Sequence, residues 1–220
     1  MTTLSEQLKE IVREHHLLSH PFYRAWSEGR LSKEILRRYA GQYFAQVSAF
    51  PRFVSAVHSR CPEIDARKVL LQNLVDEELK GTDHPELWLR FAEGLGATRE
   101  EVKSQALLPN TAAMVDTYFE LTARDWTEGL CALFAYEWQV PEVSTSKIAG
   151  LKNFYGVDDD RTLSFFKVHE HYDVEHSNQV AALIDRYAEP KTAERATREA
   201  SRALWTFLDG IADASVVACQ

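Results

Sequence analysis

The amino-acid sequence predicts an all-α protein, and two features of the chain support this fold class. First, apolar residues recur three and four positions apart along nearly every segment, as in Leu4, Leu8 and Ile11, which is the period of an amphipathic helix. Second, glycine and proline, the residues that interrupt helices most strongly, number only 9 and 7 among 220 residues. No segment shows the convincing alternation of a β-strand. We therefore expect one helical bundle, a single domain that spans residues 1–220.

Turn and capping residues divide the chain into about eight to ten helices with connections of about two to eight residues, as is usual in bundles. His20-Pro21 begins a short segment that ends at Gly29. Ser32 is a good N-cap for a long helix, which Cys61-Pro62 ends. The later breaks, in chain order, are Gly81 to Pro85, Gly94 to Gly96, Pro109-Asn110, Val140-Pro141, Gly156 to Asp160 and Glu189-Pro190. No connection is long enough to separate domains.

Composition and charge exclude several classes of partner. The chain has 33 acidic residues against 25 lysines and arginines, a net charge of −8, whereas nucleic acids and anionic membranes bind clustered cations. Cys61, Cys131 and Cys219 show no CxxC spacing, so neither a disulfide framework nor a thiolate metal site is indicated. No signal peptide and no long uncharged apolar segment is found. We expect a cytoplasmic protein without nucleic-acid or membrane partners.

The region 162–187 carries polar residues where an amphipathic helix carries core residues. His169, Asp173 and His176 share the spacing of its apolar residues, so a helix aligns them all on one face. The apolar members of that face are Phe166, Val180, Leu183, Ile184 and Tyr187. The neighbouring residues Glu170, His171 and Glu175 project away from it and are expected to face solvent.

Two further regions place acids on apolar faces. Glu137 continues the core positions of residues 130–134 and should point inward. Glu77 continues a similar face over residues 70–74, although Glu78 lies on the flank of the same face. His84 follows Glu77 by two helical turns, with a possible helix break at Gly81 between them.

Together these residues predict a buried two-metal centre. The set contains three carboxylates and three imidazoles: Glu77, His84, Glu137, His169, Asp173 and His176. A buried charge is costly unless it is paired or bound to metal, and two divalent cations would neutralise this set. Carboxylates and imidazoles from facing helices bind iron or manganese in helical dimetal proteins. The alternative is a group of buried polar pairs with some exposed acids.

Three sequence blocks resemble a known family. NLVDEELKGTDH, AYEWQVPEVSTSK and HEHYDVEH occur in the order and with the internal spacing of the haem-oxygenase-like dimetal oxidases, a group that includes TenA thiaminases and PqqC. Within this group the chain is most similar to the CADD-type proteins, named after the Chlamydia protein associating with death domains. The likeness runs from HPFYRAW near the N-terminus to the last helix. It implies a haem-oxygenase-like fold and the same six metal ligands.

The resemblance also implies an activity. Tyr23, in HPFYRAW, matches the tyrosine that CADD-type proteins consume to make para-aminobenzoate for folate synthesis, and Lys147, in STSKIAG, matches the amino donor. Tyr39 and Tyr136 match residues that line the site. The implied cofactors are two transition-metal ions, Fe/Fe or Mn/Fe, with dioxygen and an external reductant as co-substrates. The implied protein is a homodimer that needs no separate aromatic substrate.

The residues themselves support part of this assignment. Lys147 shares a helical face with Leu151 and Phe154 that would otherwise be core. A desolvated lysine has a lowered pKa and can act as a nucleophile. Core packing explains Tyr23, Tyr39 and Tyr136 equally well.

Three other functions are compatible with the sequence. The same dimetal site would also suit oxidation of a separate small substrate, such as an amino acid, a fatty acid or an amine. A metal-free TenA-like hydrolase would use Cys131, six residues before Glu137, although a lone cysteine in GLCALFAY is typically a small core residue. A non-enzymatic interaction protein would use the metal only for structure.

Overall fold

The computed structural model describes the backbone of residues 2–217 and, within that range, the side chains of all residues except 171–173 and 213–217. The described residues form helices and no strand, so the all-α prediction is confirmed. The first half contains α1 (Leu4–Glu14), η1 (Leu17–Ser19), α2 (Pro21–Ser27), α3 (Lys33–Arg60), α4 (Ile64–Glu78), α5 (His84–Gly94) and α6 (Arg99–Ser104). The second half contains α7 (Pro109–Arg124), α8 (Trp126–Glu137), α9 (Val140–Phe154), α10 (Asp160–Tyr187) and α11 (Pro190–Val217). No helix of the described range is both long and apolar enough to cross a lipid bilayer.

Local sequence explains most helix boundaries. The Ser32 hydroxyl accepts a hydrogen bond from the backbone N–H of Ile35 at 3.3 Å and caps α3, as the sequence predicts. The structure adds one break that the sequence analysis missed, at Asp125, which separates α7 from α8. The backbone of Asp125 is extended and its carboxylate accepts from the N–H of Thr127 at 2.8 Å. No glycine or proline lies at this position, and apolar periodicity alone does not show where one helix ends and the next begins.

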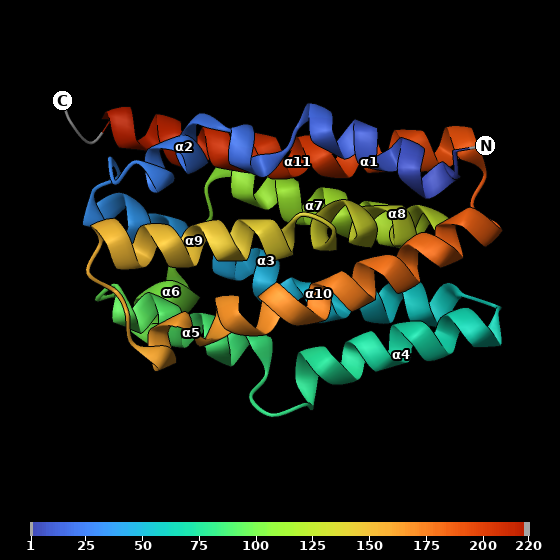
Figure 1. Ribbon diagram of the computed structural model, residues 1–220, viewed down its shortest axis with the longest axis horizontal. Helices are drawn as coiled ribbons and strands as arrows, with labels where there is room; N and C mark the ends of the chain where they lie inside the picture. Colours follow the sequence, from blue (N-terminus) through green and yellow to red (C-terminus); the bar gives the residue numbers. More distant parts are fainter. Residues whose placement is uncertain (1, 218–220) are drawn as a thin grey trace.

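The helices run side by side, with α1 and α11 along one edge of the molecule and α4 and α5 along the opposite edge (Figure 1). Helix α8 lies at the centre, where it packs against α3, α7, α10 and α11. Every residue of α8 from Glu128 to Glu137 is buried. A helix that is apolar on all sides belongs in the core of a bundle, so the carboxylate at its last residue, Glu137, is placed deep inside the protein.

Helices α2 and α9 approach each other closely at Gly150. A Cβ atom at this position would lie 2.6 Å from Cδ1 of Trp26, whose side chain is fully buried. The indole N–H of Trp26 donates to the backbone carbonyl of Lys147 at 3.3 Å. The glycine therefore lets the helix that carries Tyr23 pack directly on the helix that carries Lys147.

One expectation for α9 is wrong at its end. Lys147 and Leu151 are buried as predicted, but Phe154 is 53% exposed. Its ring packs over Gly29, which adopts a positive φ of 68° in the turn after α2. Phe154 is the last residue of α9. At this position the helix packs against the surface turn at Gly29 and no longer against the core.

We predict that Gly150→Ala lowers the free energy of unfolding by about 1–3 kcal/mol, because the added methyl group overpacks a site whose neighbour has no free space to move into. Urea denaturation would measure this change. The control is Lys152→Ala on the exposed side of the same helix. Equal stability of the two variants would contradict a tight contact between α2 and α9.

Candidate metal centre

Three of the six predicted ligands meet in the interior of the bundle. Glu77, His84 and His169 are buried, and one potential ligand atom from each lies within 4.8 Å of the other two. They come from the last turn of α4, the first residue of α5 and the middle of α10. The inward orientation predicted for them is confirmed by their burial, and Glu78, the competing acid, is exposed.

The turn between α4 and α5 brings Glu77 and His84 together. Helix α4 ends at Glu78 and the chain turns through Gly81, whose φ of +81° favours glycine. Asp83 then caps α5 by accepting from the N–H of Glu86 at 2.8 Å. As a result Nδ1 of His84 lies 2.8 Å from Oε2 of Glu77, but in a geometry that makes no hydrogen bond to any described residue.

The ring of His169 has a defined tautomer. Its Nδ1 lies 2.7 Å from the backbone carbonyl of Phe165, which can only accept, so Nδ1 carries the proton and Nε2 keeps its lone pair. Burial lowers the pKa of His169 well below its usual value of 6.5, and the nearby His84 lowers it further. A neutral imidazole oriented by a backbone carbonyl is the usual state of a histidine that binds metal.

Glu137 and His176 form a second buried pair. Oε1 of Glu137 accepts from the side-chain amide of Asn73 at 2.6 Å, whereas Oε2 is buried without a hydrogen-bond partner among the described residues. Burial raises the pKa of Glu137 to about 8, against the opposing effect of Asn73 and with a further increase from Glu77. Nδ1 of His176 lies 3.8 Å from Oε1 of Glu137. A buried carboxylate with one oxygen that lacks a hydrogen-bond partner, as in Glu137, is suited to binding a cation.

A small cavity lies beside Glu77, His84 and His169. It is lined by Val47, Phe50, Glu77, His84, Tyr136, Phe165 and His169 and has a volume of about 10 Å³. This is about the space that one water molecule needs. The orphaned oxygen of Glu137, the fixed tautomer of His169 and the mixed oxygen and nitrogen donors together fit divalent iron or manganese.

The remaining residues of the predicted ligand helix are only partly described. Asp173, the sixth predicted ligand, and His171 have side chains outside the described residues. Glu175 is exposed, as predicted. Glu170 is half-buried and accepts from the hydroxyl of Thr145 at 2.7 Å. The assignment of all six residues as ligands remains a prediction.

Lys147 occupies an aromatic cage next to this centre. Its Nζ is buried and lies 5.0–5.5 Å from the centroids of five rings. The rings belong to Tyr23, Tyr39, Tyr43, Trp88 and Phe166. No acid is found among these neighbours, and burial lowers the pKa of Lys147 to about 7.

A chain of hydrogen bonds links Lys147 to Tyr23. Nζ of Lys147 donates to the hydroxyl of Tyr39 at 2.7 Å, and that hydroxyl lies 2.9 Å from the hydroxyl of Tyr23. Burial raises the pKa of both tyrosines well above 10, so both remain phenols. The structure therefore brings together three residues that the resemblance selected separately.

Ring contacts connect the aromatic cage to the small cavity. Trp88 belongs to the cage and packs against Phe165 with ring centroids 4.8 Å apart. Phe165 lines the cavity and stacks on His169 at 4.1 Å. Tyr136, predicted to line the site, also lines this cavity. Ring contacts from Trp88 through Phe165 to His169 thus join the cage around the amine to the candidate ligands.

The structure argues against Cys131 as a nucleophile. Its side chain is fully buried in α8, and burial raises the pKa of the thiol to about 12. A catalytic cysteine needs an accessible thiolate. Cys131 is therefore a core residue.

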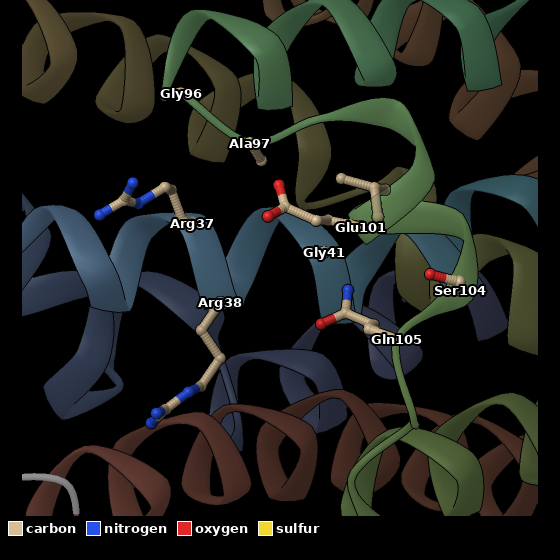
Figure 2. Close-up of a pocket in the computed structure, with 9 residues that line it drawn as sticks. Arg37, Arg38, Gly41, Gly96, Ala97, Glu101, Ser104 and Gln105 are labelled. Atoms are coloured by element: carbon tan, nitrogen blue, oxygen red, sulfur yellow. The ribbon is translucent and has the colours of Figure 1, made fainter.

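A larger pocket lies elsewhere on the described part of the protein. It has a volume of about 520 Å³ and lies on the surface between α3 and the segment around α6. Figure 2 shows Arg37 and Arg38 projecting from opposite sides of α3, with Glu101 and Gln105 on the facing segment. None of the predicted site residues lines it, so pocket size alone would have pointed away from the candidate centre.

One acid at this centre, Asp76, was not predicted from the sequence. Asp76 is buried beside Glu77, and its Oδ2 lies 3.0 Å from Nε2 of His176. Burial raises the pKa of this carboxyl, but the hydrogen bonds from His176 and Lys80 outweigh that effect and the pKa is lowered. Asp76 was missed because it lies about 100° from the apolar face of α4. The only sequence signal was its position next to Glu77.

Comparison with known proteins shows which protein family this chain belongs to. Residues 37–207 match the model of a family described as iron-containing redox enzymes. Among curated proteins, the chain is 43% identical to a 4-aminobenzoate synthase of Nitrosomonas europaea, covering 95% of this chain and 91% of the relative. A 4-aminobenzoate synthase of Chlamydia muridarum is 38% identical, with coverages of 93% and 88%.

Solved structures support the same fold. A TenA homologue from Pseudomonas syringae superposes with a TM-score of 0.83 at 16% identity, covering 94% of this chain and 92% of that one. The resemblance to CADD-type, haem-oxygenase-like proteins is therefore confirmed at the level of family and fold.

We predict that purified wild-type protein binds two divalent ions per chain and that His169→Ala binds at most one, because the substitution removes the donor with the fixed tautomer. Metal analysis after loading with ferrous iron would count the ions. His58→Ala, an imidazole outside the centre, is the control. Full occupancy in His169→Ala would remove this residue from the ligand set.

We also predict a pH-dependent effect on stability from Lys147→Met. The pKa of Lys147 is about 7 in the folded protein, against an ordinary value of 10.5, so between these values the unfolded chain binds more protons and wild-type stability rises with pH. Lys147→Met should therefore be more stable than wild type near pH 6, and the difference should shrink above about pH 7.

Thermal unfolding of the metal-free proteins across this pH range measures the difference, with the exposed Lys152→Met as control. A difference that does not vary with pH would mean that the ring faces stabilise the ammonium form and that the amine keeps its proton.

Proposed function

We propose that this chain, which belongs to the family of iron-containing redox enzymes, forms 4-aminobenzoate in an oxygen-dependent reaction at a two-metal centre. In this proposal the ring of Tyr23 supplies the carbon skeleton and Lys147 supplies the nitrogen. The observation that carries the proposal is the buried chain from Lys147 through Tyr39 to Tyr23. In this chain an amine and a phenol contact one hydroxyl, next to a group of candidate metal ligands.

The metal would be held by the buried carboxylates and imidazoles already described, with Asp173 as the sixth ligand. The ligand set is Glu77, His84, Glu137, His169, Asp173 and His176. The ions, two irons or one manganese and one iron, would supply the activation of dioxygen with electrons from an external reductant. The protein residues would fix the ligand geometry and exclude water.

The small size of the cavity that the described residues leave beside the candidate ligands supports Tyr23 as the substrate. The cavity beside the candidate ligands measures about 10 Å³, whereas a cavity that binds benzene is about 150 Å³. Tyr23 is itself buried in the adjoining cage, with an edge-to-face contact to Tyr39. A reaction on the protein's own ring needs no binding pocket, and the chain would be spent after one turnover.

The environment of Lys147 suits an amine that acts as a nucleophile. A pKa of about 7 leaves a large neutral fraction at physiological pH, and a neutral amine has a free electron pair. The hydrogen bond to Tyr39 holds Nζ in place. The surrounding rings exclude water that would otherwise restore the usual pKa.

The proposal also includes the cellular setting. The product would serve folate synthesis, and the protein would act as a cytoplasmic homodimer without nucleic-acid or membrane partners. The family likeness and the acidic net charge of −8 support these points.

The decisive experiment follows isotopes from the protein into the product. Protein that contains ¹³C-ring-labelled tyrosine and ¹⁵Nζ-labelled lysine should release 4-aminobenzoate that carries both labels when it is loaded with metal and given reductant and oxygen. Mass spectrometry would detect the labels and the loss of mass at Tyr23. We expect at most one product molecule per chain.

Two tyrosine variants make this test specific. Tyr23→Phe should abolish product formation, whereas Tyr118→Phe should not change it, because Tyr118 is equally buried but belongs to neither the cage nor the cavity. Unlabelled product from labelled protein, or repeated turnover in Tyr23→Phe, would instead indicate a dimetal oxidase that acts on a separate small substrate.

A further inference from the structure

Asp76 is held firmly in one orientation at the edge of the candidate metal centre. Its side chain is only 6% exposed, and its Oδ2 lies 3.0 Å from Nε2 of His176. The other oxygen, Oδ1, accepts from the side-chain amide of Gln72 at 3.2 Å and lies 3.3 Å from Nζ of Lys80. Both oxygens therefore have partners, and only one of them faces the centre.

The two ring nitrogens of His176 have different environments. Nε2 faces a carboxylate, which can only accept, so Nε2 carries the proton. Nδ1 then keeps its lone pair and faces Oε1 of Glu137 at 3.8 Å. This distance is too long for a hydrogen bond, but two donor atoms at this separation can bind the same ion.

The Asp76–His176 pair lies between the interior and a surface pocket. The pocket has a volume of about 330 Å³, and its lining is polar throughout: Gln72, Asp76, Lys80, Glu175, His176 and Gln179. It lies where α4 and α10 approach each other (Figure 1). Glu175 is an exposed carboxylate in the same pocket and is bonded to Gln179 instead of to a histidine.

We propose that Asp76 is a positioning residue that accepts a hydrogen bond from Nε2 of His176 and thereby directs Nδ1 toward a divalent ion shared with Glu137. Removing such a carboxylate usually weakens metal binding 10- to 100-fold. The inference depends on the proposed function only in requiring a metal centre.

Titration with Mn²⁺ tests the inference without any measurement of catalysis. The electron paramagnetic resonance signal of free Mn²⁺ gives the number of bound ions and their affinities. Asp76→Leu keeps a similar volume but has no acceptor, and should bind one ion about 10- to 100-fold more weakly. Asp76→Asn keeps an acceptor oxygen and should bind close to wild type.

A matched control separates orientation from general attraction of cations. Glu175→Gln removes the same charge from the same pocket, where the carboxylate of Glu175 accepts a hydrogen bond from Gln179, and should leave both affinities unchanged. Equal weakening in Asp76→Asn and Glu175→Gln would overturn the inference, because it would assign the effect to charge alone.

A double-mutant cycle tests whether Asp76 acts through His176. In the His176→Ala background, Asp76→Leu should cause no further loss of affinity, since the residue that it orients is already absent. Additive losses would overturn the inference. Circular dichroism of the metal-free variants checks folding, and Asp76→Ala replaces Asp76→Leu if the leucine variant does not fold.

The outcomes distinguish this inference from the proposed function. Wild-type protein that binds neither Mn²⁺ nor ferrous iron would overturn both. Two bound ions in wild type and the same affinities in Asp76→Leu would overturn the positioning role alone and leave the proposed function intact.

Discussion

The cost of burying charge inside a helical bundle is the constraint on which this structure depends. Helix α8 is surrounded by other helices, and its last residue is a carboxylate, Glu137, with one oxygen that no described residue satisfies. An uncompensated carboxylate in such a place costs several kcal/mol. The surrounding elements supply the compensation: Asn73 from α4 donates to it, and His176 from α10 approaches it. The position of the candidate metal centre follows from this requirement.

Burial acts on the two halves of the site in opposite directions. It raises the pKa of Glu137 to about 8 and lowers the pKa of Lys147 to about 7. In both cases the apolar interior favours the uncharged form. A cation beside Glu137 would favour its charged form, whereas Lys147 has five rings and one hydroxyl as neighbours. The bundle therefore holds a candidate cation-binding group and a deprotonatable amine whose aromatic surroundings are joined by the contact between Trp88 and Phe165.

Much of the candidate site was predictable because helical periodicity reports which residues face inward. Glu77, Glu137, His169, His176 and Lys147 replace core residues in otherwise regular apolar patterns, and all are buried. Helical periodicity does not predict burial where a neighbouring helix, and not the residue's own helix, determines its surroundings. Asp76 lies off the apolar face of α4, yet it is covered by α10 and bonded to His176, 100 residues away. Phe154 lies on a face that is buried over most of α9, yet it is exposed where the helix ends.

The sequence by itself determined the all-α class, most of the helix boundaries and the kinds of donor that face the interior, because these properties depend on spacing and capping over a few residues. Only the tertiary structure decided which atoms meet. The hydroxyl of Tyr39 contacts Tyr23, 16 residues away, and Lys147, 108 residues away. These contacts depend on how closely α2, α3 and α9 pack. The direct contact between Gly150 of α9 and Trp26 of α2 sets the distance between those two helices. A periodic pattern defines a face of one helix, and the packing of several helices determines what that face contacts.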